Sequence, residues 1–179
     1  MIYLDRNESQ YGPAPECFNS LKNVGVEQLS QYTRDYARGV KSRVSEKLAD
    51  WIGVTEKNIL LSYGCEGLLK YAVHEFLPHG GTLMIPDKSW WYYAEIAKEV
   101  KGTTCEYLIT EGETSFHFDI DNMIDVYTSH KPDLVFIASP NNPTGNAMSH
   151  EDMKRICAEF KDAIIILDEA YWGFSTLDN

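Results

Sequence analysis

Short apolar runs alternate with segments of helical periodicity over most of this chain, and this alternation constrains the fold more than any other feature. Five runs rich in β-branched and aromatic residues predict strands at 58–62, 82–85, 104–109, 134–138 and 163–167. Apolar spacing and stop signals predict helices over 66–77, 90–101 and 121–129, and a fourth that Ser149 caps and that ends near 161. Such alternation predicts an α/β fold, with a mostly parallel sheet inside a three-layer α/β/α domain.

The first part of the chain departs from this alternation. Residues 1–14 are expected to be extended, and the prolines that follow Gly12 break any helix. A short helix and a tyrosine-rich stretch over 31–39 come next, and then helical spacing from Val40 to Ile52, which Gly53 ends. We therefore divide the chain into an N-terminal arm, residues 1–38, and a large domain, residues 39–179.

Charge and composition exclude several classes of function. The net charge is −11 and the pI is about 4.8, so the chain lacks the positive charge that binding to nucleic acid or to a membrane surface requires. Residues 1–6 contain no apolar stretch of the signal-peptide kind, which predicts a cytoplasmic protein. The four cysteines are far apart and are expected to be reduced and mostly buried. The five histidines show no close ligand spacing, so no metal site is predicted.

The most informative segment is residues 138–145, Ala-Ser-Pro-Asn-Asn-Pro-Thr-Gly, directly after a predicted buried strand. Ligands of α/β sheets bind outside the carboxyl ends of the strands. A rigid turn flanked by prolines can hold one asparagine amide so that it points into the crevice there. An ordinary Asn/Pro/Gly turn is the alternative, but it does not account for the full run.

A second segment ends another predicted buried strand with Asp168-Glu169-Ala170-Tyr171. A buried acid is costly unless a cationic group meets it. Alternate residues of a strand share a face, so Asp168 and Ala170 are expected to point the same way and to leave room for a flat ring. The alternative is that Asp168 only caps a helix.

Together these two segments resemble the fold-type-I aminotransferases, which use pyridoxal 5'-phosphate, and in particular the branch of the histidinol-phosphate aminotransferases. The opening, residues 4–12, is similar to the Asn-Glu-Asn-Pro-Tyr-Gly opening of that branch, with Ser9 and Gln10 departing from it. The resemblance covers only the first part of such an enzyme. It implies an incomplete large domain and an arm that belongs to a small domain.

The resemblance implies a role for each matching residue. Asp168 pairs with the pyridine nitrogen of the cofactor and keeps it protonated, so that the ring can act as an electron sink. Asn142 and Tyr171 bind the phenolic oxygen of the ring, and Ala170 packs under one ring face. Asp168 and Tyr171 are the candidate catalytic residues.

Several other residues are candidates for binding the cofactor or the substrate, and alternatives stay open for most of them. The backbone amides of Gly64, Cys65 and Glu66 are placed to bind the cofactor phosphate at a helix start, although an ordinary strand–helix turn is nearly as good an interpretation. In the aromatic run 90–93, Tyr93 is the first candidate to stack on the ring and Trp90 the second. The resemblance also places one tyrosine, Tyr32 with Tyr36 as the alternative, at the phosphate of a partner subunit, which implies a homodimer. For substrate binding, it implies Asn7, Tyr11 and Gly12.

The expected reaction is amino transfer between an amino acid or amino phosphate and a 2-oxo acid. In the family, the lysine that holds the cofactor lies beyond the Asp-Glu-Ala-Tyr segment, and all eleven lysines of this chain precede it. The chain alone is therefore expected to be inactive. Two alternatives stay open: another reaction of the same cofactor, such as decarboxylation of a phosphorylated amino acid, and a non-catalytic binding or dimerisation module.

Overall fold

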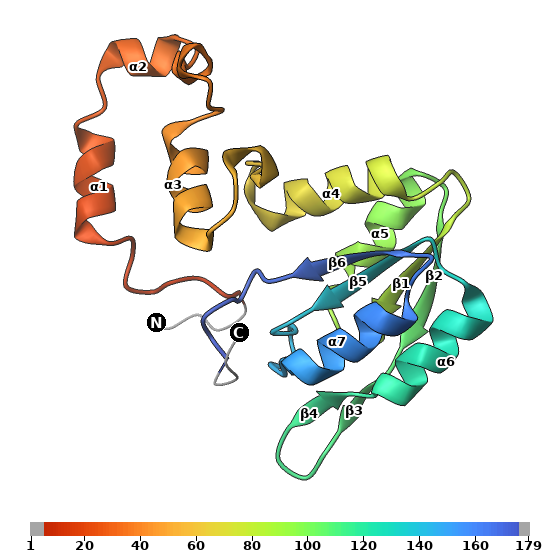
Figure 1. Cartoon of the computed structure of the whole chain (residues 1–179). Helices are drawn as coiled ribbons and strands as arrows, with labels where there is room; N and C mark the ends of the chain where they lie inside the picture. The colour runs from red at the N-terminus through yellow and green to blue at the C-terminus, as the bar shows by residue number, and fades with distance from the viewer. Residues whose placement is uncertain (1–5, 176–179) are drawn as a thin grey trace. The chain divides into compact units, whose positions relative to one another are not determined.

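The computed structural model describes residues 6–175, which form two compact units that divide between Leu60 and Leu61 (Figure 1). This boundary lies beyond residue 38, where the sequence analysis ends the arm, and the assignment of domains stays a prediction. No helix within the described residues is long and apolar enough to cross a membrane.

The first unit consists of short helices. They are α1 (Pro15–Lys22), α2 (Val26–Ser30), η1 (Asp35–Arg38), α3 (Arg43–Ile52) and η2 (Glu56–Asn58). Ser42 caps α3 by accepting a hydrogen bond from the backbone N–H of Ser45, and Gly53 ends the helix in the left-handed conformation, with φ of 81°. The predicted helix and its glycine stop are thus confirmed, although the helix begins at Arg43 and not at Val40.

Glu56 joins α3 to η2. Its Oε1 accepts hydrogen bonds from the backbone N–H of Lys41 at 2.9 Å and from the hydroxyl of Ser45 at 2.6 Å. These donors, Ser45 first, hold the pKa of Glu56 below its ordinary value. The carboxylate therefore ties the start of α3 to the segment that follows the helix.

The second unit is built on a four-stranded parallel sheet in the order β2-β1-β5-β6 (Figure 1). The strands are β1 (Thr82–Pro86), β2 (Thr103–Tyr107), β5 (Leu134–Ala138) and β6 (Ile164–Asp168). The helices are α4 (Gly64–Phe76), α5 (Tyr92–Glu99), α6 (Ile120–His130) and α7 (His150–Glu159). A separate antiparallel pair consists of β3 (Ile109–Glu111) and β4 (Phe116–Phe118).

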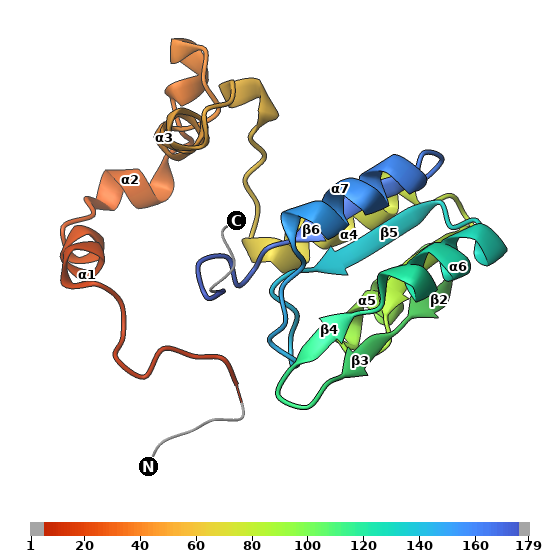
Figure 2. The same cartoon turned by 60° about the horizontal axis from the view of Figure 1, so that its bottom comes forward.

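The two faces of the sheet are covered by different helices, which gives three layers (Figures 1 and 2). On β5, Val135 and Ile137 pack in the core formed with α6 and α7, whereas Leu134 and Phe136 pack in the core formed with α4 and α5. This alternation is the period of two that a strand buried on both faces imposes. The predicted three-layer α/β/α class with a mostly parallel sheet is confirmed.

Two of the predicted strands were wrong, one entirely and one in its bounds. Residues 58–62 form no strand: η2 ends at Asn58, and the backbone after it pairs with no neighbouring strand. The run 104–109 is divided, because Asp87 binds the backbone on both sides of Leu108. The N–H of Asp87 donates to the carbonyl of Tyr107, and its Oδ1 accepts from the N–H of Ile109. The chain then leaves the sheet and enters the β3–β4 hairpin, which sequence analysis missed.

Two expectations of burial were also wrong. Strand β6 was expected to be buried, but Ile164 and Leu167 are each about 40% exposed because β6 is the edge strand of the described sheet. Of the four cysteines, all of them free, only Cys105 is buried, and burial raises its pKa to about 11.

Candidate functional site

The loop after β5 is held in place by one of its two asparagines. Asn141 is 3% exposed; its Oδ1 accepts a hydrogen bond from the hydroxyl of Ser89 at 2.6 Å. Its Nδ2 donates to the carbonyl of Lys88 at 2.7 Å and to the hydroxyl of Thr144 at 2.6 Å. The N–H of Gly145, which has φ of 74°, donates to the carbonyl of Asn141 and closes the turn. Asn141 thus fastens the loop to the segment that follows β1.

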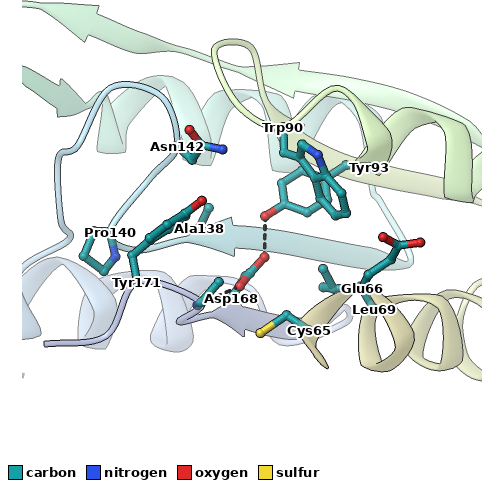
Figure 3. Close-up of a pocket in the computed structure, with 11 residues that line it drawn as sticks. Cys65, Glu66, Leu69, Trp90, Tyr93, Ala138, Pro140, Asn142, Asp168 and Tyr171 are labelled. Carbon is teal, nitrogen blue, oxygen red and sulfur yellow. Dashed lines mark hydrogen bonds between the residues drawn. The ribbon is translucent and has the colours of Figure 1, made fainter. Parts of the chain in front are cut away.

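The neighbouring Asn142 lies in the crevice. It lines a cavity, and within residues 6–175 its side-chain amide contacts no hydrogen-bond partner (Figure 3). The asparagine amide that the turn was predicted to direct into a crevice is therefore that of Asn142. Asn141 supports the loop, and Asn142 presents a donor and an acceptor to the cavity.

Asp168 ends strand β6 and is bound by two donors. Its Oδ2 accepts from the hydroxyl of Tyr93 at 2.6 Å, and its Oδ1 accepts from the backbone N–H of Ala170 at 3.0 Å. The second bond closes a turn of the Asx type, so the strand stops at Asp168. The expectation that Ala170 shares a strand face with Asp168 was wrong, although both residues line the cavity together with Tyr171.

The start of α4 forms another wall. Cys65 and Glu66, in its first turn, line the cavity, whereas Gly64, with φ of 74°, is not among the lining residues. Tyr63 occupies the N-cap position, is fully exposed and makes no side-chain cap. The side chain of Tyr63 therefore does not cap this 13-residue helix, whose positive end is directed at the cavity.

Two of the four aromatics in 90–93 reach the cavity, Trp90 and Tyr93, as Figure 3 shows. Tyr93 is 2% exposed, and its ring packs edge-on against Phe136, with centroids 5.3 Å apart. Trp91 is 70% exposed and, like Tyr92, does not line the cavity. The run thus supplies two aromatic walls.

The cavity has a volume of about 280 Å³ and lies beyond the carboxyl ends of the strands. Its walls come from the start of α4, from the segment after β1, from the loop after β5 and from the end of β6. Strands β2 and β5 flank β1 on opposite sides, so the cavity lies where the strand order reverses, the usual binding position in such sheets. The lining residues that received no role from the sequence are apolar: Leu69, Ala138 and Pro140. Nothing in their residue types distinguishes them from core residues.

The Asp168 carboxylate influences two titratable neighbours. Burial, and then the charge of Asp168, raise the pKa of the Tyr93 hydroxyl, which stays protonated and donates its hydrogen bond. The same two causes, in the same order, raise the pKa of the Cys65 thiol. Cys65 is thus kept mainly as a thiol near neutral pH, not as a reactive thiolate.

The remaining predicted site residues belong to the first unit. Tyr32 and Tyr11 are almost completely exposed, Asn7 and Gly12 are exposed, and the roles of all four stay predictions. Among residues 6–175, no group of three or more His, Cys, Asp or Glu side chains is placed to hold a metal ion.

Comparisons with known proteins agree with the geometry. The model of the family "Aminotransferase class I and II" matches residues 1–178. A histidinol-phosphate aminotransferase of Ruminiclostridium cellulolyticum is 27% identical over 176 residues, which cover 97% of this chain and 48% of that protein. One from Caldanaerobacter subterraneus subsp. tengcongensis is 29% identical over 171 residues, covering 96% and 47%. The chain spans about half the length of the curated relatives it matches.

Solved structures share the fold. Histidinol-phosphate aminotransferase from Sinorhizobium meliloti, in complex with pyridoxal 5'-phosphate, superposes with a TM-score of 0.78 at 20% identity, covering 92% of this chain and 43% of that one. The pyridoxal-phosphate-bound C-S lyase from Staphylococcus hominis has a TM-score of 0.66 at 19% identity, covering 88% and 41%. Enzymes described by two different reactions therefore share this part of the fold.

Proposed function

This chain belongs to the aminotransferase class I and II family, and we propose that it is the part of a pyridoxal-phosphate aminotransferase that binds the cofactor. One observation carries the proposal. Asn142, from the loop after β5, lines a single cavity together with Asp168 and Tyr171, from the end of β6, and with the start of α4.

The lining of the cavity fits this cofactor. A volume of about 280 Å³ lies just below the roughly 300–1,000 Å³ of typical small-molecule sites, which suits a single flat ring with a short substituent. Trp90, Leu69 and Ala138 provide apolar surface for the ring. The backbone amides of the first turn of α4, which Tyr63 does not cap, suit a phosphate, because an anion at a helix N-terminus needs no basic side chain.

When bound, pyridoxal phosphate supplies a protonated pyridine ring that draws electrons from the α-carbon of an amino substrate. In this site Asp168 would accept a hydrogen bond from the ring nitrogen and hold the proton there. Asn142 and Tyr171 would bind the phenolic oxygen, and Cys65 and Glu66 would offer backbone N–H groups to the phosphate. Ala170, whose side chain is small, would leave room for one face of the ring.

The proposed reaction is amino transfer between an amino acid or an amino phosphate similar to histidinol phosphate and a 2-oxo acid. The names of the curated relatives support this substrate class. None of the eleven lysines lines the cavity, so we propose that this chain by itself binds the cofactor without a covalent bond and has no turnover. The homodimer, with Tyr32 at the partner's cofactor, stays a prediction.

Equilibrium dialysis of the purified chain against pyridoxal phosphate tests the proposal. We expect saturable binding of one cofactor per chain. Asp168→Ala should weaken it about 10- to 100-fold, since hydrogen bonds to charged groups contribute about 1.5–3 kcal/mol. Glu169→Ala removes the adjacent acid, which is exposed and does not line the cavity, and should change the dissociation constant less than about twofold. Equal losses in both variants, or no saturable binding, would count against the proposed site.

A further inference from the structure

Tyr93 is fixed more firmly than any other aromatic in the run 90–93. It is the second residue of α5, and its ring makes edge-on contacts with Phe136 and Trp90, whose ring centroids lie 5.3 Å and 5.7 Å away. Its hydroxyl lies 2.6 Å from Oδ2 of Asp168 (Figure 3). A ring buried to this extent has little free face to offer a ligand.

The carboxylate of Asp168 is correspondingly fixed from two directions. The N–H of Ala170 binds Oδ1, and the hydroxyl of Tyr93 binds Oδ2. An ionised carboxylate offers about four acceptor positions, so two remain for another donor. Burial and the charge of Asp168 raise the pKa of Tyr93, so the hydroxyl keeps its proton and remains the donor of this pair.

We propose that Tyr93 is a positioning residue, which sets the orientation of the Asp168 carboxylate toward the ring nitrogen of the cofactor, and that Trp90 is the aromatic left to face the ring. This inference rests on the proposed function. It reverses the order in which the sequence analysis ranked the two aromatics. The hydroxyl of Tyr93, and not the face of its ring, is the group that acts.

The effect follows from the freedom of an aspartate side chain. With Oδ2 released, the carboxylate is held only through Oδ1 and can rotate about its terminal bond, which has a broad torsional preference. The remaining acceptor positions of the carboxylate then no longer point in one direction. The carboxylate must therefore become ordered when the ring nitrogen binds to it. Catalytic groups require such support from the residues behind them.

Tyr93→Phe tests this inference, with Tyr107→Phe as the matched control. Tyr107 is also fully buried and also donates one hydrogen bond, to the carbonyl of Phe136 at 3.1 Å, but it does not line the cavity. We expect Tyr93→Phe to weaken pyridoxal phosphate binding about tenfold and to shift the nitrogen-15 resonance of the labelled ring toward the unprotonated form. Tyr107→Phe should leave both within about twofold of the unsubstituted chain.

A double-mutant cycle shows whether Tyr93 acts through Asp168. In an Asp168→Ala background, Tyr93→Phe should change the dissociation constant less than about twofold. An undiminished tenfold effect there, or unchanged or tighter binding by Tyr93→Phe alone, would overturn the positioning role. If Asp168→Ala weakens binding and Tyr93→Phe does not, only this inference fails; if the unsubstituted chain binds no cofactor, the proposed function fails with it.

One further measurement needs no substitution, in case Tyr93→Phe does not fold. The hydroxyl proton of Tyr93, shielded and bound to Asp168, should exchange slowly enough to be seen by NMR in the free chain. Addition of pyridoxal phosphate should shift that resonance, because the ring nitrogen binds the same carboxylate. A hydroxyl proton that the cofactor leaves unmoved would contradict the proposal.

Discussion

Two adjacent asparagine side chains have different roles in this molecule. Asn141 is buried and makes three side-chain hydrogen bonds that fasten the loop, whereas Asn142 faces the cavity. The sequence motif predicts that one amide points into the crevice. It does not say what holds the other, because the partners Ser89 and Lys88 lie about 50 positions away along the chain.

This difference leads to opposite outcomes for two substitutions. Asn141→Ala should lower the free energy of unfolding by about 2–4 kcal/mol, because it removes three partly buried hydrogen bonds that hold the loop. Asn142→Ala should lower it by less than about 0.5 kcal/mol and should instead weaken cofactor binding. Urea unfolding followed by circular dichroism provides the comparison. Similar losses of stability in the two variants would show that the roles given to Asn141 and Asn142 are wrong.

At the element scale, the sequence predicts elements well where burial on two faces leaves a clear period, as in β5, whose observed bounds are those predicted. It fails where a distant side chain intervenes. Asp87 ends β2 by binding the backbone around Leu108, and no local pattern in 104–109 signals this. The run 58–62 has the composition of a strand but lacks a neighbour to pair with.

The hydrogen bonds of Glu56 at the junction of α3 and η2 predict that the stability of the first unit depends on pH. Hydrogen bonds lower the pKa of Glu56 in the folded state, so its carboxylate stabilises the first unit at pH values above the ordinary glutamate pKa of 4.5. This contribution is lost as the pH falls through the lower folded value. Glu56→Gln should therefore reduce the thermal midpoint of the α3 segment by about 2–4 °C at pH 7, but not near pH 2.

The NMR signals of α3 measured against temperature provide this test. Asp50→Asn, at an exposed acid on the same helix, is the control and should cause no loss at either pH. Ser45→Ala should raise the pKa of Glu56 toward its ordinary value, since the Ser45 hydroxyl is the largest cause of the shift. A Glu56→Gln loss of thermal stability that is equal at both pH values would show that the charged carboxylate is not its cause.

At the scale of the whole molecule, the class of fold and most of the cavity residues could be predicted, because parallel strands bring their carboxyl ends to one edge of the sheet. The hydrogen bond between Tyr93 and Asp168 could not be predicted from the sequence, since it joins residues 75 positions apart. The apolar lining was missed as well, because Leu69 and Pro140 have no chemical signature of their own. The roles given to Tyr32, Asn7, Tyr11 and Gly12 stay predictions from the resemblance.

A crystal structure of this chain grown with saturating pyridoxal phosphate would show whether the cavity holds the cofactor. We expect one cofactor in the cavity, with the ring nitrogen within hydrogen-bond distance of Asp168, the phosphate at the first turn of α4, and no covalent bond to any of the eleven lysines. A cofactor bound elsewhere, a cofactor attached to a lysine of this chain, or a cavity left without cofactor at saturation would contradict the account.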